Sequence, residues 1–409
     1  MEFYKETRFK NSEIGEVPED WGVVRLIDVA EYINGYAFSP KDWKDKGLPI
    51  IRIQNLNDPK AEFNYFDGVI DNKYIVENGD ILFSWSASIG VYIWNRGRAV
   101  LNQHIFKVVP KNNVDRLFLY YTLFLAIEQL KNRVHGSTMK HFKRSELNTT
   151  FIPLPPLEEQ KKIAEVLSNT DKAIQKVDES IEKFEKLKKG LMNILLNGKV
   201  RIKVENGKFY FYKETKFKNS EIGEVPEDWE VVRLGKIVEI YDNKRVPLNE
   251  QEREKMKGPY PYCGANGILD YINNYIFDGE YILLAEDGGY WGKFENSAYI
   301  MNGKFWVNNH AHVLKALNGI AYNRFLMYIL NFLDLTPYIV GSTRGKLNQK
   351  DMKNIKLPLP PIEEQQKIVE ILSKIDKVIQ LKKEKKEKLE KIKKYFMDNL
   401  LTGKVRIKL

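Results

Sequence analysis

Side chains that could contact a nucleic acid gather in glycine-punctuated loops in two parts of the chain. Residues 84–98 and 137–144, and again 242–245, 286–294 and 341–346, place lysines and arginines beside serine and aromatic residues. Lysine and arginine contact phosphates, while arginine, serine and asparagine hydrogen-bond to base edges. The candidate contact residues are Trp85, Ser86, Ser88, Arg96, Arg98, Lys140, His141, Lys143, Arg144, Lys244, Arg245, Tyr290, Trp291, Lys293, Ser342, Thr343, Arg344 and Lys346. Each one alone is more simply a solvated charge or a core aromatic, but the set as a whole favours nucleic-acid contact.

Signatures of enzymes are poorly represented. Residues 341–347 resemble a phosphate-binding loop, but the motif is one residue short and lacks the serine or threonine after its lysine. No G-x-G-x-x-G follows a strand-like run, so a dinucleotide or methyl-donor pocket is unsupported. His310 and His312 could share one strand face but have no third ligand nearby, and His104 and His141 lack a triad context. The sequence therefore predicts no catalytic residue, no metal site and no cofactor held by this chain.

The composition is typical of a chain with a polyanionic partner. The formal net charge is +10, although a high lysine content is also typical of thermophilic proteins. The single cysteine, Cys263, excludes an internal disulfide framework and fits a reducing cytoplasm. The first ten residues are polar, and no run of about 18 apolar residues occurs. We therefore expect a cytoplasmic location, with no secretory signal and no membrane span.

Two matched helices must position these loops. Residues 155–198 and 360–403 each begin with Pro-Pro and an acidic pair and end at a glycine after an apolar pair. Proline loses no hydrogen bond in a first turn, acids there complement the helix dipole, and glycine accepts the left-handed cap. Between residues 153–175 and 358–380, 16 of 23 positions are identical.

An apolar stripe on these helices predicts that they pair with each other. Its members are Ile163, Val166, Val177, Phe184, Leu187, Leu191, Ile368, Ile371, Ile375, Leu389, Ile392 and Phe396, with Leu167, Ile181, Leu372 and Ile379 widening it. Helices of about 40 residues span roughly 60 Å and favour an antiparallel coiled coil. The alternative is that each helix packs only on its own domain. Lys382 and Lys385 interrupt the second stripe and leave the register open there.

A second repeat indicates that the whole domain plan is duplicated. Residues 4–26 and 212–234 differ at only two of 23 positions, and the segments that end the helices, 195–203 and 400–408, also match. The globular blocks between these pieces share layout but little sequence. In the first, residues 48–53 and 81–85 predict strands, 91–94 and 99–101 a hairpin, and 117–129 a helix; in the second, 280–284 predict a strand and 323–333 a helix. A duplicated scaffold therefore carries two unlike surfaces, suited to a target with two non-identical halves.

The whole chain resembles the DNA-specificity subunit of a type I restriction–modification system. The resemblance lies in four pieces that each occur twice. They are the leader (residues 4–26 and 212–234), the variable globular block after it, the helix start Pro-Leu-Pro-Pro-(Leu/Ile)-Glu-Glu-Gln and the ending (Asn/Thr)-Gly-Lys-Val-Arg. Residues 102–104 (Asn-Gln-His) and 262–267 (Tyr-Cys-Gly-Ala-Asn-Gly) support it. The resemblance implies a non-catalytic subunit in which each variable block reads one half of a split sequence in double-stranded DNA. It also implies two methyltransferase subunits, which use S-adenosylmethionine, and restriction/translocase subunits, which use ATP and magnesium.

The resulting fold class is α+β (mixed α/β), with two globular target-recognition domains related by a pseudo-two-fold duplication and separated by two long antiparallel coiled-coil helices. The expected boundaries are 1–154 for the first domain with its leader, 155–208 for the first helix and linker, 209–359 for the second domain, and 360–409 for the second helix and tail. Two other functions remain open at this point. One is a standalone DNA-modifying or DNA-cleaving enzyme, and the other is a coiled-coil scaffold without a nucleic-acid role.

Overall fold

Packing divides the chain into two units. The computed structural model describes residues 2–133, 144–205, 208–341 and 345–408. The first unit comprises Met1–Asp178 with Glu384–Leu409, and the second comprises Glu179–Lys383. Each unit therefore contains one globular domain together with part of each long helix.

The two long helices begin and end as their sequences predict. Helix α4 covers Leu157–Leu195 and α8 covers Ile362–Leu400, each 39 residues long. The expected capping glycines, Gly198 and Gly403, have φ values of 69° and 72°. A Cβ atom on either glycine would lie 2.3 Å or 2.4 Å from a proline ring carbon of the leader, so glycine is required both for the cap and for the close approach. Among the described helices, none is long and apolar enough to cross a membrane.

In the first unit, two four-stranded sheets form the domain. They are ordered β10-β9-β12-β5 and β7-β6-β11-β8. The strands of this unit are β1 (Phe3–Lys5), β2 (Phe9–Ser12), β3 (Gly15–Pro18), β4 (Gly22–Arg25), β5 (Ala30–Asn34), β6 (Leu48–Ile51), β7 (Asn64–Phe66), β8 (Ile75–Val76), β9 (Ile81–Ser84), β10 (Gly90–Ile93), β11 (Ala99–Leu101), β12 (Ile105–Pro110), β13 (Phe151–Leu154) and β28 (Val405–Ile407). Its shorter helices are α1 (Leu26–Val29), α2 (Ile53–Asn57) and α3 (Arg116–Arg133).

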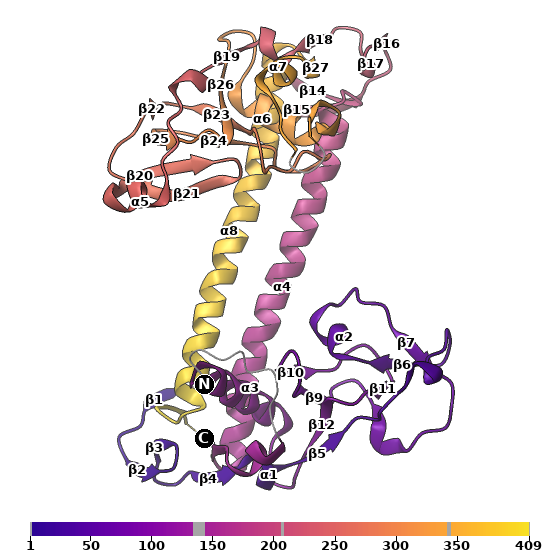
Figure 1. Ribbon diagram of the computed structural model, residues 1–409, viewed down its shortest axis with the longest axis vertical. Helices are drawn as coiled ribbons and strands as arrows, with labels where there is room; N and C mark the ends of the chain where they lie inside the picture. The colour runs from indigo at the N-terminus through magenta and orange to yellow at the C-terminus, as the bar shows by residue number, and fades with distance from the viewer. Residues whose placement is uncertain (1, 134–143, 206–207, 342–344, 409) are drawn as a thin grey trace. The chain divides into compact units, whose positions relative to one another are not determined.

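The second unit repeats this topology (Figure 1). Its sheets are ordered β19-β26-β23-β24 and β21-β20-β25-β22. Its strands are β14 (Val200–Glu205), β15 (Lys208–Lys213), β16 (Phe217–Ser220), β17 (Gly223–Pro226), β18 (Glu230–Arg233), β19 (Val238–Ile240), β20 (Lys257–Gly264), β21 (Gly267–Ile272), β22 (Phe277–Asp278), β23 (Tyr281–Ala285), β24 (Ala298–Met301), β25 (Lys304–Val307), β26 (Ala311–Ala316) and β27 (Lys356–Leu359). Its shorter helices are α5 (Glu250–Lys255), α6 (Asn323–Phe332) and α7 (Gln349–Lys353).

The predicted hairpin of residues 91–94 and 99–101 is wrong. Strand β10 pairs with β9, whereas β11 pairs with β6 and β8 in the other sheet. The segment 95–97, between the two strands, therefore passes the chain from one sheet to the other. Two apolar segments on either side of a turn do not show that they pair with each other, because strand pairing depends on packing against the rest of each sheet.

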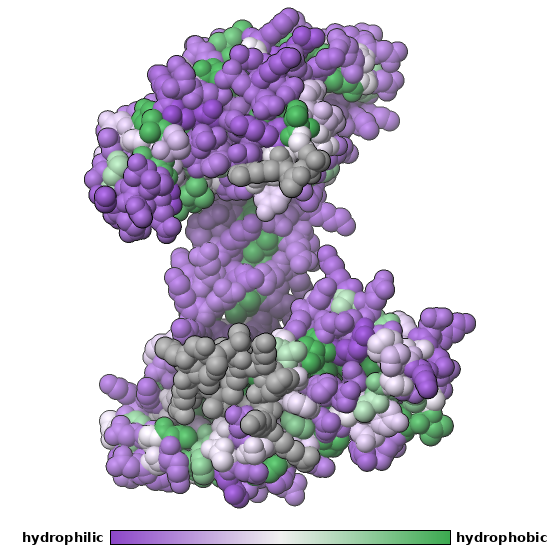
Figure 2. Space-filling view, in the orientation of Figure 1, coloured by the Kyte–Doolittle hydropathy of each residue, from purple (hydrophilic) through white to green (hydrophobic). Residues whose placement is uncertain are grey.

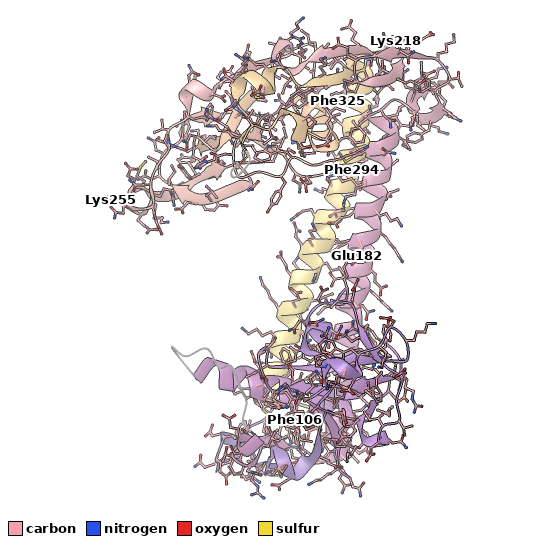
Figure 3. All side chains as sticks on the ribbon, turned by 45° about the vertical axis from the view of Figure 1, so that its right-hand side comes forward. Phe106, Glu182, Lys218, Lys255, Phe294 and Phe325 are labelled. Atoms are coloured by element: carbon pink, nitrogen blue, oxygen red, sulfur yellow. The ribbon has the colours of Figure 1, made fainter. Side chains whose placement is uncertain are left out.

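Each domain packs one helix against its first sheet. In the first unit, α3 buries Leu119 and Leu123 against a cluster that includes Phe106 of β12. In the second, α6 lies against β23 and β24 and buries Phe325 and Ile329 in the largest cluster. Figure 3 labels Phe106 and Phe325 within these two domains. The part of the second unit's surface that faces the viewer in Figure 2 is largely hydrophilic, as expected when the apolar side chains fill the core.

In each unit the two long helices run antiparallel. In the first unit, Asp171 and Asp178 of α4 pair with Lys393 and Lys386 of α8, with N–O distances of 2.6 and 2.8 Å. In the second unit, Lys188 pairs with Asp376 at 2.6 Å, and Glu185 pairs with Lys383 at 3.1 Å. In both units the residue numbers rise along α4 as they fall along α8.

The predicted stripe is correct only in part. Ile163, Val177 and Ile368 are buried, and the intermediate members are Val166, Phe184, Leu191, Ile371, Ile375, Leu389 and Phe396. Leu187 and Ile392 are 48% and 44% exposed, so their assignment to the stripe is wrong. Ile181 and Ile379, which were predicted to widen the stripe, are buried; a straight helix has 3.6 residues per turn, so its buried face drifts from a strict heptad count.

The interruption by Lys382 is accommodated without a buried charge. Its ammonium group lies 5.2 Å from the centre of the Phe184 ring, within the second unit. Lys382 is partly buried beside this ring, an arrangement in which the aliphatic stem of a lysine packs while its charge stays accessible.

Candidate nucleic-acid interface

In the first domain, several strands end at one edge. Strand β9 ends beside Trp85, whose backbone N–H donates to the carbonyl of His104 at 3.1 Å. Strand β6 ends beside Arg52, and the N–H of Asn102 donates to the carbonyl of Ile51 at 3.1 Å. The turn 102–104 connects β11 of one sheet to β12 of the other. Residues from both sheets therefore meet at this edge, which we call the first edge.

The second domain builds an equivalent edge from different side chains. The N–H of Glu286, after β23, donates to the carbonyl of His310 at 2.9 Å, and the N–H of Asn308 donates to the carbonyl of Cys263 at 3.0 Å. The turn 308–310 connects β25 to β26 as 102–104 connects β11 to β12. These residues form the second edge. The backbone framework is the same in both domains, and the side chains on it differ.

The first edge is neutral and aromatic around Trp85. The indole Nε1 donates to Asn34 Oδ1 at 3.1 Å, and the ring meets the imidazole of His104 edge-on at a centroid distance of 4.8 Å. Ser86 is buried, and Ser88 Oγ donates to Asn57 Oδ1 at 3.4 Å. Trp85 is therefore held in place by its neighbours while part of its surface stays exposed.

The second edge contains a buried ion network at the matching place. His312 Nδ1 lies 2.7 Å from Asp242 Oδ2, and its Nε2 lies 2.7 Å from the carbonyl of Leu347. Arg245 donates to Glu286 at 2.5 Å, and the Lys346 ammonium lies 3.0 Å from the same carboxylate. Asp242, Glu286 and His312 present atoms within 4.8 Å of one another. Two cations already face these carboxylates, so the arrangement is that of an ion network.

The charges in this network set the protonation of its carboxylates. Burial is the largest influence on the pKa of Asp242 and raises it, but His312, Gln349 and the N–H of Val313 together hold it below its ordinary value. For Glu286, burial again raises the pKa and is outweighed by Arg245, Lys346 and His312 together. Both groups are therefore ionised near neutral pH.

The repeated Glu-Glu-Gln at the start of each long helix supplies a carboxylate that holds other segments of its unit. In the first, Arg406 of β28 donates to Glu159 at 2.9 and 2.7 Å, and the indole of Trp21 donates to the same carboxylate at 3.0 Å. In the second, Arg201 donates to Glu364 at 2.7 Å by two nitrogens, and Trp229 donates to it at 3.1 Å. The second glutamate of each Glu-Glu-Gln thus joins helix, tail and leader.

Comparison with known proteins identifies the family. The family described as the type I restriction modification DNA specificity domain matches residues 18–185 and again 226–391. The chain belongs to this family of DNA-specificity proteins. The MjaVIII specificity subunit of Methanocaldococcus jannaschii is 32% identical over 100% of this chain and 98% of its own length. The MjaX specificity subunit of the same organism is 34% identical over 100% and 99%.

Solved structures confirm the fold expected of a DNA-specificity protein. The S subunit of a type I restriction–modification system from M. genitalium covers 93% of this chain and 96% of its own, with a TM-score of 0.62 and 17% identity. A chain from a study of complex assembly and conformational transition in a type I system covers 95% and 99%, with a TM-score of 0.51 and 18% identity.

Several candidates from the sequence point inward rather than toward a ligand. The Arg96 guanidinium lies over the Trp94 ring at 4.7 Å and donates to the carbonyl of Asn55, and burial lowers its pKa. Arg245 belongs to the buried network described above, and Trp291 Nε1 donates to the carbonyl of Ala285 at 3.3 Å. These three side chains stabilise the domains of this DNA-specificity protein.

Other candidates remain at the surface. Tyr290 is 62% exposed, Lys244 and Lys293 are exposed, and Arg98 lies 3.5 Å from Glu77 with 58% of its side chain exposed. Lys346 keeps nearly half its side chain exposed while it pairs with Glu286. The candidates that lie outside the described residues are Lys140, His141, Lys143, Ser342, Thr343 and Arg344, and the side chain of Arg144 is likewise not described.

Sequence reasoning overlooked members of both edges. Arg52, Asn102 and His104 at the first edge, and Asp287 and His310 at the second, were not among the candidates. A signal was present, because Asn-x-His directly precedes the matching strand in both blocks, at residues 102–104 and 308–310. The same three positions therefore precede the strand next to each edge.

Proposed function

We propose that this chain selects the DNA sequence for a type I restriction–modification complex and reads a bipartite target with one domain for each half-site. The observation that supports this most directly is the pair of edges. The same strand ends and the same turn carry an aromatic surface beside Arg52 in one domain and a buried network of paired charges in the other. Two unlike surfaces on one duplicated framework suit a target with two unlike halves.

The chain acts in this proposal without a catalytic centre of its own. Its one thiol, Cys263, is buried, and burial raises its pKa to about 12, so a nucleophilic role near neutral pH is unsupported. We expect two methyltransferase subunits with S-adenosylmethionine, and restriction subunits with ATP and magnesium, to supply the chemistry in the cytoplasm. The paired helices α4 and α8 would dock these subunits and set the spacing between half-sites.

Exchanging one domain tests the proposal. The globular block between the leader and α4 would be replaced by the block of another family member, and the complete complex would be assayed by sequencing methylated sites. Only one half of the methylated sequence should change. A change in both halves, or in neither, would contradict the assignment of one half-site to each domain.

A standalone enzyme is the alternative to exclude. Purified chain would be incubated with DNA, magnesium and S-adenosylmethionine without partner subunits. We expect neither methylation nor cleavage, and robust turnover would overturn the proposal.

A further inference from the structure

The first edge contains buried polar atoms that lack hydrogen-bond partners. Among the described residues, these atoms include Arg52 Nε, Asn102 Oδ1 and His104 Nδ1, all at the first edge, and Asn64 Oδ1 on the neighbouring strand. An unpaired buried polar atom destabilises a fold, so native proteins keep few of them. Their concentration at one edge requires a reason other than stability.

The backbone at the same edge is strained. Ala87 and His104 have φ values of 57° and 74°, although neither is glycine. Ala87 is three residues beyond the end of β9, and His104 directly precedes β12. Strained, non-glycine residues of this kind cluster at ligand sites, where the conformation serves binding rather than stability.

The second edge shows that the fold does not require these features. There, Asn308 Oδ1 accepts from the N–H of His310 at 2.8 Å, and His310 Nδ1 lies 2.6 Å from Asp287 Oδ1. Gly288, three residues beyond β23, occupies the place of Ala87 with φ 63°. The same turn is therefore satisfied internally in one domain and unsatisfied in the other.

The side chains at the first edge carry the hydrogen-bonding groups that proteins use to recognise bases. Arg52 lies over the exposed Trp43 ring at 5.3 Å, and no carboxylate among the described residues pairs with its guanidinium. Arg52, Asn102 and His104 are each half-buried, so part of every side chain reaches the surface. In the major groove, arginine pairs with the O6 and N7 atoms of guanine, and asparagine pairs with the N6 and N7 atoms of adenine.

We propose that Arg52 and Asn102, oriented beside His104, are specificity-determining residues that read a G·C pair and an A·T pair of the first half-site. The inference rests on the proposed function and adds the residues and bases to it. Small rotations of these side chains on DNA bring the unpaired atoms to base edges, so their hydrogen bonds form only in the complex. The matching positions of the second domain already have internal partners and contribute less.

The test uses the complete complex with Arg52→Gln and Asn102→Ala. Each would methylate a random DNA library, and the methylated sites would be sequenced. Arg52→Gln should lower discrimination at one G·C pair, and Asn102→Ala at one A·T pair, each by about 5- to 150-fold. The second half-site should stay unchanged. Unaltered preference at the first half-site in both variants would overturn the inference, as would an equal loss on all sequences.

Two control variants separate base reading from charge and from folding. Arg25→Ala removes an exposed charge of the same domain, one that pairs with Asp28, and should leave the preferred sequence unchanged. Asn308→Ala removes a side chain that accepts a hydrogen bond and should lower the melting temperature of the chain. Asn102→Ala removes an oxygen without a hydrogen-bond partner, so without DNA the melting temperature should be equal to or higher than that of the unchanged chain. A lower melting temperature for Asn102→Ala, matching Asn308→Ala, would count against the inference. If the unchanged complex methylates no bipartite sequence, the proposed function fails first and the inference fails with it.

Discussion

The network around Arg406 gives a sharp prediction for Arg406→Met. The guanidinium donates twice to Glu159, twice to Asp20 at 2.8 Å, and once to Glu6 at 2.9 Å. Methionine has a similar length and no charge, so the substitution keeps much of the packing and removes the cation. Three carboxylates then lose their shared partner.

The expected magnitude follows from the exposure of each carboxylate. The side chain of Asp20 is 54% exposed, so water replaces its lost hydrogen bonds. Those of Glu159 and Glu6 are 1% and 9% exposed, and they are left charged without a cation. Removing one partner of a buried ion pair costs about 3–5 kcal/mol, and we expect Arg406→Met to lower the free energy of unfolding by that amount.

Urea unfolding of the purified chain measures this loss, and Lys408, the residue after strand β28, offers a control. Lys408 pairs with Glu2 while both side chains are largely exposed (68% and 72%), so Lys408→Met should cost less than about 1 kcal/mol. Adding Glu159→Leu to Arg406→Met should recover part of the loss, because one of the two buried carboxylates left without a cation is then removed. A loss for Arg406→Met no larger than that for Lys408→Met would refute the reasoning.

Four further predictions concern stability, pH, salt and spacing. Asp171 accepts from the hydroxyl of the buried Tyr121 at 2.7 Å, so Asp171→Ala, which removes that acceptor, should lower the free energy of unfolding by about 1–3 kcal/mol in urea titrations. The backbone N–H of Arg8 and the side chain of Arg406 hold the pKa of Glu6 at about 2 against an ordinary 4.5. The resulting stabilisation is present above pH 4.5 and should be lost as the pH falls toward 2. Glu6→Gln should abolish this part of the pH dependence when the free energy of unfolding is measured in an acid titration. The logarithm of DNA affinity of the complete complex should fall against log salt with a slope of about −0.9 per phosphate contact, and a flat response would argue against phosphate contacts. Inserting one heptad into both α4 and α8 should lengthen the unread spacer in methylated sites without altering the bases read; constant spacing would show that the helices do not set it.

The fold could be predicted from the sequence where the signals are local. Prolines, an acidic first turn and a capping glycine bounded both long helices correctly, and near-identical leaders revealed the duplication. Pairing between distant segments could not be predicted in the same way. The hairpin at residues 91–101 failed because its two strands belong to different sheets. The positions of Leu187 and Ile392 failed because a heptad count ignores the drift of a straight helix.

The candidate site was harder to predict than the fold, because a charged residue type does not reveal whether its side chain points into the domain or toward solvent. Arg96 and Arg245 looked like DNA contacts in a loop, yet both are held by carbonyl or carboxylate oxygens inside their domains. Asn102 and His104 belong to a segment that supports the family resemblance, but the sequence did not mark them as DNA contacts. Their distinguishing features are a missing partner and a positive φ, respectively, and these exist only once the strands on either side are in place.

The structure also explains how unlike domains can share one scaffold. In the first unit, the side chain of Gln160 donates to the carbonyl of Asn113 at 3.2 Å and accepts from the N–H of Asp115 at 2.8 Å. In the second, Gln365 donates to the carbonyl of Ile320 at 3.0 Å and accepts from the N–H of Tyr322 at 3.1 Å. The scaffold glutamine thus holds backbone atoms, which every sequence provides. A domain can therefore change its side chains, and with them the bases it reads, without losing this attachment.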